Sequence, residues 1–140
     1  MKPEGPQVLV RTITLEQFGH EMRMQGVPTH QQVAFVCPMC ATVQSAISLI
    51  LADAGADFAA VEKHLGWSCV GRFLGAEPPR RRPDGKPCDW SLGGLFKLHR
   101  LEVILADGTR AMRFELATPA AAQALWARQE LLWRRTRGGA

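Results

Sequence analysis

The stretch Val33-Ala-Phe-Val-Cys-Pro-Met-Cys40 places a short apolar run directly before a pair of cysteines. The apolar run suits a buried strand, and a Cys-x-x-Cys turn brings two sulfurs close enough to bind one metal ion. Two further cysteines, Cys69 and Cys88, follow with eighteen residues between them. Zinc prefers a tetrahedral shell of thiolate and imidazole ligands. The sequence therefore predicts a structural zinc site whose ligands are Cys37, Cys40, Cys69 and Cys88.

Four other side chains bear on this predicted site. His64 and His99 are reserve ligands, because imidazole can replace a thiolate in a closed zinc site. A site of three cysteines and one histidine therefore stays open. Trp67 and Trp90 each lie two residues from a cysteine, and we expect both rings to cover the metal.

Composition places the chain among folded globular proteins: 140 residues, of which 46% are hydrophobic and 21% charged. We expect one zinc-stabilised domain over residues 1–140, because a small core gains from a metal. The first residues lack the apolar segment of a secretory signal, and the longest apolar run, 46–52, is too short to span a bilayer. We therefore expect a cytoplasmic protein without a membrane partner, whose reduced cysteines bind metal instead of forming disulfides.

The order of apolar patterns predicts an α+β fold with a short antiparallel sheet, a β-hairpin and three to four helices. Strands are expected at 8–13, 33–36, 98–105 and 111–116. Asp107-Gly108 is a hairpin turn signal that joins the last two. The Gly93-Gly94 pair indicates a tight bend.

Helix signals separate these strands. Thr14 and Gln17 form a capping box for a helix that stops at Gly26. A second helix is expected directly after Cys40, with Val43 as its first apolar position, and it ends near residue 55. Asp57 caps a third helix over 58–65, and Thr118-Pro119 starts a last one that runs to about residue 135.

The formal net charge is +4, and the cations gather in two places. Residues 75–87 hold four prolines and four basic residues, which predicts a loop. Such clusters can contact phosphates of nucleic acid, or they can be a solvated loop and a helix end whose arginines complement the dipole. The candidate contacts to nucleic acid or a partner are Arg72, Arg80, Arg81, Arg82, Lys86, Arg134 and Arg135.

Thiol chemistry is the competing hypothesis. A strand followed by Cys-Pro-x-Cys at a helix N-terminus is the glutaredoxin arrangement, in which Cys37 would be the nucleophile and Cys40 the resolving thiol. The βαβ order expected around such a motif is missing. A zinc deaminase is excluded, because Val36 replaces the proline before Cys37 and no His-x-Glu accompanies it. The sequence also lacks His-Glu-x-x-His, a phosphate-binding glycine loop and a Gly-x-Ser-x-Gly elbow.

Three separated motifs, FVCPMCATVQSA (35–46), SCVGR (68–72) and CDWSLGGL (88–95), resemble a family of small proteins encoded by bacteriophages and prophages. The resemblance covers roughly residues 35–116, and the family carries no assigned activity from which catalytic residues could be transferred. It implies an accessory role in the cytoplasm of a host cell. Together with the cysteines, it predicts a zinc-stabilised, non-enzymatic binding module that inhibits host machinery or defence by binding a host protein or nucleic acid.

Overall fold

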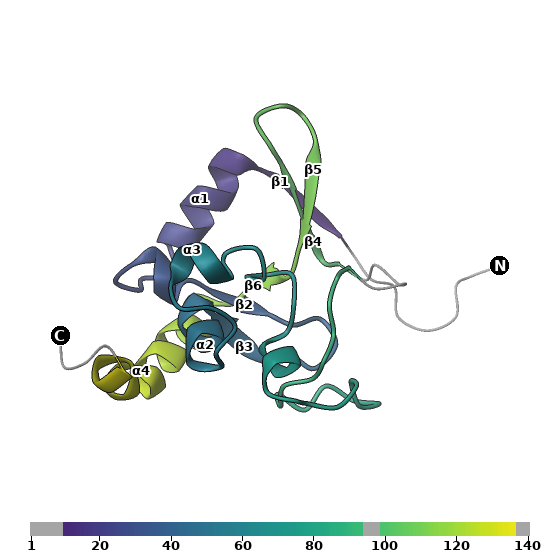
Figure 1. The fold of residues 1–140 in the computed structure, drawn as a ribbon. Coiled ribbons are helices and arrows are strands. Elements are labelled where there is room, and N and C mark those ends of the chain that lie inside the picture. The colour runs from purple at the N-terminus through teal and green to yellow at the C-terminus, as the bar shows by residue number, and fades with distance from the viewer. Residues whose placement is uncertain (1–9, 94–98, 137–140) are drawn as a thin grey trace.

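The computed structural model describes residues 10–93 and 99–136, and its strands form two three-stranded sheets (Figure 1). In the first sheet the order is β1-β4-β5, with β1 parallel to β4 and β5 antiparallel to it. In the second the order is β3-β2-β6, and both neighbours run antiparallel to β2. The strand bounds are Arg11–Thr14 (β1), Ala34–Val36 (β2), Val43–Ser45 (β3), Leu101–Ile104 (β4), Arg110–Arg113 (β5) and Glu115–Leu116 (β6).

The α+β class and the hairpin at Asp107-Gly108 are confirmed, but the strands form two sheets where the sequence predicted one. The reason lies at Phe114, which interrupts the strand expected over 111–116. Its side chain is fully buried, and its backbone N–H donates to the carbonyl oxygen of Gly66 at 2.7 Å. The chain therefore leaves the first sheet at Arg113 and enters the second at Glu115.

Four α-helices complete the described part of the fold: α1 (Leu15–Arg23), α2 (Ala46–Leu51), α3 (Phe58–Val61) and α4 (Pro119–Thr136). The predicted N-caps are confirmed. Thr14 accepts a hydrogen bond from the Gln17 amide at 3.0 Å, and Asp57 accepts one from the Ala60 amide. The reciprocal half of the Thr14 capping box does not form, because the Gln17 side chain bonds to Glu21 instead.

The prediction that a helix begins directly after Cys40 is wrong. Val43 to Ser45 form the strand β3, which pairs with β2, and α2 begins only at Ala46. Ser45 and Ser48 provide a capping box at that later point. The apolar side chain of Val43 fits a strand as well as a helix, and the pairing with Val36 decides between them. The third helix is also shorter than predicted and ends at Val61.

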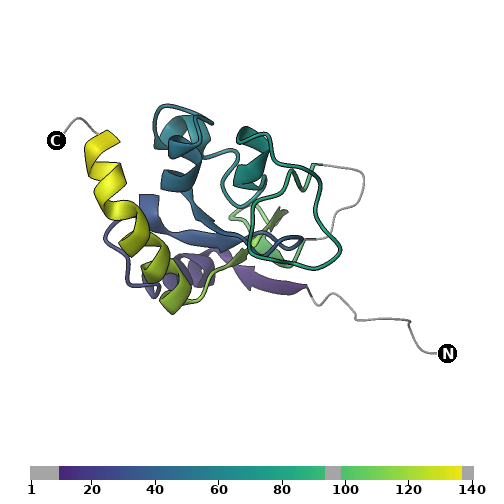
Figure 2. The ribbon, with the colours of Figure 1, turned by 90° about the horizontal axis from the view of Figure 1, so that it is seen from below.

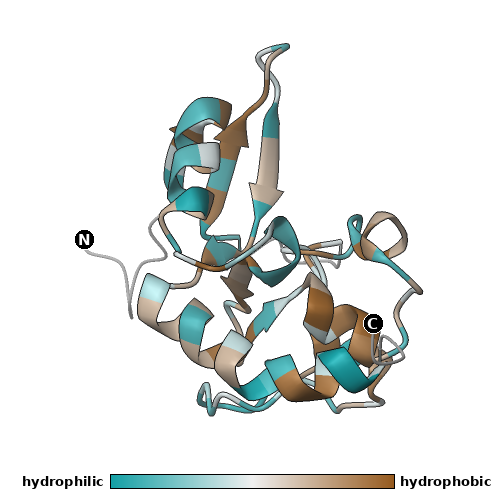
Figure 3. Ribbon diagram, turned by 90° about the vertical axis from the view of Figure 1, so that its left-hand side faces the viewer, coloured by the Kyte–Doolittle hydropathy of each residue, from teal (hydrophilic) through white to brown (hydrophobic). Residues whose placement is uncertain are grey.

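Most of the core lies between these elements, and it includes the cysteines. Large side chains such as Ile47, Leu92 and Leu101 are fully buried beside them. The helix α4 lies along the second sheet and buries Leu125 and Trp133 (Figure 2). The helix α1 is largely hydrophilic and lies beside the first sheet (Figure 3). Among the described residues, none of the helices combines the length and the apolar character needed to cross a bilayer.

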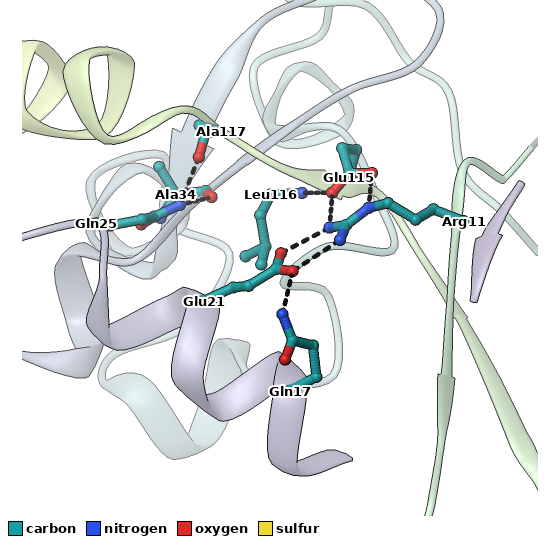
Figure 4. Close-up of polar contacts among 8 residues, drawn as sticks. All are labelled: Arg11, Gln17, Glu21, Gln25, Ala34, Glu115, Leu116 and Ala117. Atoms are coloured by element: carbon teal, nitrogen blue, oxygen red, sulfur yellow. Dashed lines mark hydrogen bonds and ion pairs between the residues drawn. The ribbon is translucent and has the colours of Figure 1, made fainter. Parts of the chain in front are cut away.

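Two polar clusters bind the parts together (Figure 4). Arg11 of β1 forms ion pairs with Glu21 of α1 and with Glu115 of β6, each at 2.7 Å, and so connects both sheets. Gln25 is almost fully buried and donates to the carbonyl oxygens of Ala34 and Ala117, while it accepts from the Ala34 amide. All these groups are satisfied by one another, so both clusters are structural.

Candidate metal centre

The structure brings the four cysteines together from three separate segments. Cys37 and Cys40 lie in the tip of the β2–β3 hairpin, Cys69 precedes the short 3-10 helix η2 (Val70–Phe73), and Cys88 ends the long loop. All four are free thiols, and none is more than 1% exposed. The site is therefore enclosed by protein on every side.

The spacing of the four sulfurs fits one tetrahedral metal ion. Cys37 Sγ lies 3.8 Å from Cys88 Sγ, and Cys40 Sγ lies 3.7 Å from Cys69 Sγ. All four sulfur atoms are within 4.8 Å of one another. Four thiolates at a Zn–S distance of about 2.3 Å would have S–S edges of about 3.8 Å. The donor set is thus placed to hold one ion without rearrangement of the backbone.

The first pair of cysteines is positioned by the turn of the hairpin. The Cys37 amide donates to the Thr42 carbonyl oxygen at 3.0 Å, and the Ala41 amide donates to the Cys37 carbonyl oxygen at 2.9 Å. Ala41 has a φ of 67°, a left-handed conformation that favours glycine. The chain accepts this strain because the turn must close directly after Cys40.

The second pair is positioned by a close approach of two backbones. Gly71 packs against Cys88 so tightly that a Cβ added to it would lie 2.2 Å from the Cys88 carbonyl oxygen. The Cys69 amide donates to the Trp90 carbonyl oxygen at 2.9 Å, and Ser68 forms a bridge with Ser91. These contacts bring the eighteen-residue insertion back to its start.

Hydrogen bonds hold the loop between Cys69 and Cys88 against the site. The Gly85 amide donates to the Cys40 carbonyl oxygen at 2.7 Å. Arg80 donates to Asp84 at 2.6 Å and to the carbonyl oxygens of Lys86 and Pro87 at 3.1 and 3.3 Å. The charges of Cys40 and Cys88 also contribute to the raised pKa of Arg80, after the hydrogen bond to Asp84. The guanidinium thus closes the loop and lies near the sulfurs, where it offsets negative charge.

Gln44 and Thr42 support the sulfurs, and sequence reasoning missed both. The fully buried Gln44 accepts from the Val70 amide at 2.7 Å and directs its Nε2 to Cys69 Sγ at 3.5 Å. The Thr42 hydroxyl lies 3.0 Å from Cys40 Sγ. The sequence carried no specific signal for them, because residues 41–46 alternate small, apolar and polar side chains. Such partners orient metal ligands and tune the site.

The close contacts among the cysteines and their burial shift the pKa values of the thiols. The contact with Cys40 raises the pKa of Cys37, and the same contact lowers the pKa of Cys40, whose sulfur accepts from its neighbours. Burial raises the pKa of Cys88 to about 12. The cluster therefore concentrates negative charge on one sulfur, and a bound dication would draw the others into the thiolate form.

A family model described as VVA0879-like matches residues 14–117, a range that includes all four cysteines and most of the chain. The chain belongs to the VVA0879-like family. A search of curated proteins and a search of solved structures gave no significant match. The matched range ends just before α4, so the family resemblance lies in the two sheets and the cysteine cluster of this VVA0879-like chain.

The reserve histidines lie outside the cluster of this VVA0879-like protein. The His64 ring packs against Phe73, with the ring centres 4.8 Å apart. His99 Nε2 lies 2.7 Å from a carboxylate oxygen of Glu102. The group that can hold a metal is therefore made of cysteine alone. Trp67 and Trp90 pack against the core cluster that contains the cysteines, and their role as a cover stays a prediction.

The basic residues of the VVA0879-like chain do not form one surface. The loop over 75–87 and the end of α4 lie at opposite sides of the molecule in both views (Figures 1 and 2). Arg72 donates to the Asp89 carbonyl oxygen, and Arg134 bonds to Glu130. Within the described ranges 10–93 and 99–136, the side chains of Arg81, Arg82, Lys86 and Arg135 make no hydrogen bond or ion pair with protein.

Proposed function

We propose that the chain is a zinc-stabilised binding module without enzymatic activity, of phage or prophage origin, which inhibits host machinery or defence by binding a host protein or nucleic acid. The observation that carries the structural part is the enclosure of four sulfurs that are at most 1% exposed. A catalytic zinc keeps one position open for water or substrate, whereas a closed shell of four thiolates contributes folding energy. The phage origin is supported by the resemblance of the three cysteine-containing motifs.

Zinc fits this shell best on chemical grounds. Thiolate ligands in a tetrahedral arrangement select zinc or iron, and hard cations such as magnesium require oxygen ligands. The two possibilities differ in colour, because iron bound to four thiolates absorbs visible light and zinc does not. An ultraviolet–visible spectrum of the purified protein therefore distinguishes the two metals, alongside the measurement of metal content.

The thiol oxidoreductase alternative finds little support in the geometry. A reactive thiol needs access and a lowered pKa, often at a helix N-terminus. Cys37 is 1% exposed, its pKa is raised, and β3 follows the turn in place of a helix.

Metal content together with thiol titration tests the proposal. One zinc per chain is expected, with all four cysteines protected from alkylation until a chelator is added. The variant Cys88→Ser should lose the metal, because it removes one of the four thiolates that the site offers. Metal-free protein whose Cys37 is readily alkylated would refute the structural zinc and restore the redox hypothesis.

The loop beside the metal centre is the surface that best supports nucleic-acid contact. The Arg80 side chain bonds to Asp84 and to the Lys86 carbonyl oxygen within the loop. Arg81 and Arg82 follow it on a backbone that these bonds hold in place. Alanine replacements at both should weaken binding to nucleic acid and flatten its dependence on salt, since each phosphate contact releases counterions. Alanine replacements at Arg134 and Arg135 in the last turn of α4 remove the same two charges from the opposite side of the molecule (Figure 2). Equal binding by all variants would exclude this loop as the contact.

A further inference from the structure

A cleft of about 610 Å³ separates α3 from the strand β5. One wall is formed by Ala59, Glu62 and Lys63 of α3 and its following turn, together with Trp67. The other wall is the whole of β5. The volume of the cleft lies within the range of pockets that bind small molecules.

β5 is the edge strand of its sheet, and its open edge faces this cleft. The direction of its amides follows from the hairpin. The Leu105 amide donates to the Thr109 carbonyl oxygen, and Val103 pairs with Ala111 and Leu101 with Arg113. Because bonded pairs alternate along an antiparallel ladder, the amides of Ala111 and Arg113 point to β4.

The amides and carbonyls of Arg110 and Met112 therefore point away from β4, toward the open edge. The next outward amide, that of Phe114, already bonds to the Gly66 carbonyl oxygen at 2.7 Å. The edge thus pairs at one end with the segment that follows α3. Beyond it, the outward backbone groups of Arg110 and Met112 have no partner within residues 10–93 and 99–136. An extended peptide can bond to such an edge as an additional strand.

The charges of the cleft favour an acidic occupant. Lys63, Arg110 and Arg113 line it, and Glu62 is its one lining carboxylate among the described residues. Arg110 also forms an ion pair with Glu102 of β4 at 3.3 Å, so Lys63 and Arg113 carry most of this preference. Burial lowers the pKa of Arg113, whose guanidinium donates to the Leu65 carbonyl oxygen at 3.0 Å and has further N–H groups to offer.

A smaller pocket of about 190 Å³ adjoins the cleft and shares Glu62 and Arg113 with it. Its other lining side chains are mainly apolar, and they come from α1, from α3 and the turn after it, and from residues 30–35, which include part of β2. Alternate residues of an added strand point to opposite faces. One apolar side chain of the peptide can therefore enter this pocket while its neighbours face the cations.

We propose that the cleft between α3 and β5 binds an extended acidic peptide segment of a partner protein, added to β5 as a further strand. This rests on the proposed binding role and names its partner class, an acidic segment with an apolar anchor. The outward backbone groups of Arg110 and Met112 supply the pairing, and the three cations supply the preference for acidic sequences.

The test selects from a displayed library of random peptides of about ten residues, the length of a long strand, and measures the affinity of a synthetic selected peptide by fluorescence anisotropy. Met112→Pro removes an outward N–H that the fold itself does not use, and Met112→Ala is its matched control, which keeps that N–H. Lys63→Glu reverses one charge of the cleft, and Arg128→Glu makes the same change on an exposed position of α4.

Selected peptides should alternate acidic and apolar residues, and they should bind the wild type, Met112→Ala and Arg128→Glu alike. Met112→Pro and Lys63→Glu should each weaken binding about tenfold. Full affinity for both of these variants, or a selection without acidic enrichment, would overturn the proposal. Zinc content is measured on the wild type and on every variant. A wild type without zinc would contradict the proposed function, whereas a variant that keeps its zinc but no longer binds the peptide has lost the cleft alone.

Discussion

Replacing Gly71 with alanine should disrupt the metal centre without removing a ligand. A Cβ at this position would lie 2.2 Å from the carbonyl oxygen and 2.7 Å from the amide nitrogen of Cys88, with Ala76 Cβ at 2.9 Å. Ordinary contacts of a Cβ begin at 3.4 Å, so the Cys88 backbone must withdraw by about 1 Å (3.4 − 2.2 Å). Metal–ligand distances vary by only about 0.2 Å around their usual values, so this shift would hold Cys88 Sγ away from its best position in the shell.

The expected cost has two parts. Overpacking of a tight contact destabilises a protein by about 1–3 kcal/mol. Disturbed support of a metal ligand lowers affinity by about 10–100-fold, which is a further 1.4–2.8 kcal/mol when metal is limiting. Urea unfolding with and without a chelator separates the two parts, and competition with a chromophoric chelator measures the affinity directly.

Gly19→Ala is the matched control for this substitution. Gly19 lies within α1, where the nearest atom to an added Cβ is the flexible end of Arg23 at 3.4 Å. Alanine in a helix interior is favoured over glycine by up to about 1 kcal/mol, so this variant should be as stable as the wild type or more so. A Gly71→Ala protein that keeps wild-type zinc affinity and an unchanged unfolding midpoint would refute the role of the close approach.

Three further substitutions test other parts of the structure. Ala41→Gly should raise the free energy of unfolding by about 0.5–1 kcal/mol, because glycine adopts the φ of 67° without strain; urea denaturation measures this, and a loss of stability would contradict it. Gln25→Leu should lower the free energy of unfolding by about 2 kcal/mol in the same assay, because the Ala34 amide would lose its buried partner, and a neutral effect would be inconsistent with that bond. The ion pair with Arg11 lowers the pKa of Glu21 from 4.5 to about 2, so its stabilisation is present above about pH 5 and is lost as the pH falls toward that value. The difference between wild type and Glu21→Gln, about 1 kcal/mol at neutral pH for a partly exposed pair, should therefore shrink between about pH 5 and pH 3, and a difference independent of pH would speak against the ion pair.

The sequence predicted those features whose signals are local. The caps at Thr14, Asp57 and Thr118 and the turn at Asp107-Gly108 are set by a few neighbouring residues, and the structure has them where they were expected. The four cysteines were also identified together, because thiol chemistry restricts what a closed group of them can do. The reserve histidines could not be excluded from spacing alone.

The features that sequence missed depend on contacts between distant segments. Val43 belongs to a strand because Val36 lies opposite it, and its own side chain carries no sign of this. Arg80 was assigned to a contact surface by its charge, and this stays a prediction; its bonds to Asp84 and to two loop carbonyls could not be foreseen from the sequence. Likewise, position 71 requires glycine only because Cys88, seventeen residues further along the chain, packs directly against it. Composition indicates which residues are basic or small, but their partners decide what they do.

The metal centre and the cleft share one short segment of backbone, which gives the proposed zinc a consequence beyond stability. The Leu65 carbonyl oxygen accepts from Arg113, and the Gly66 carbonyl oxygen accepts from the Phe114 amide; both contacts fix the end of the cleft. Trp67 forms its wall, and Cys69 follows two residues later as a ligand. Removal of the proposed zinc would free the Cys69 side chain. Only the hydrogen bonds of residues 65–67 would then keep this side of the cleft in place. The apo protein should therefore bind the selected peptide more weakly even where its sheets remain folded, because the order of this segment would have to be restored on binding.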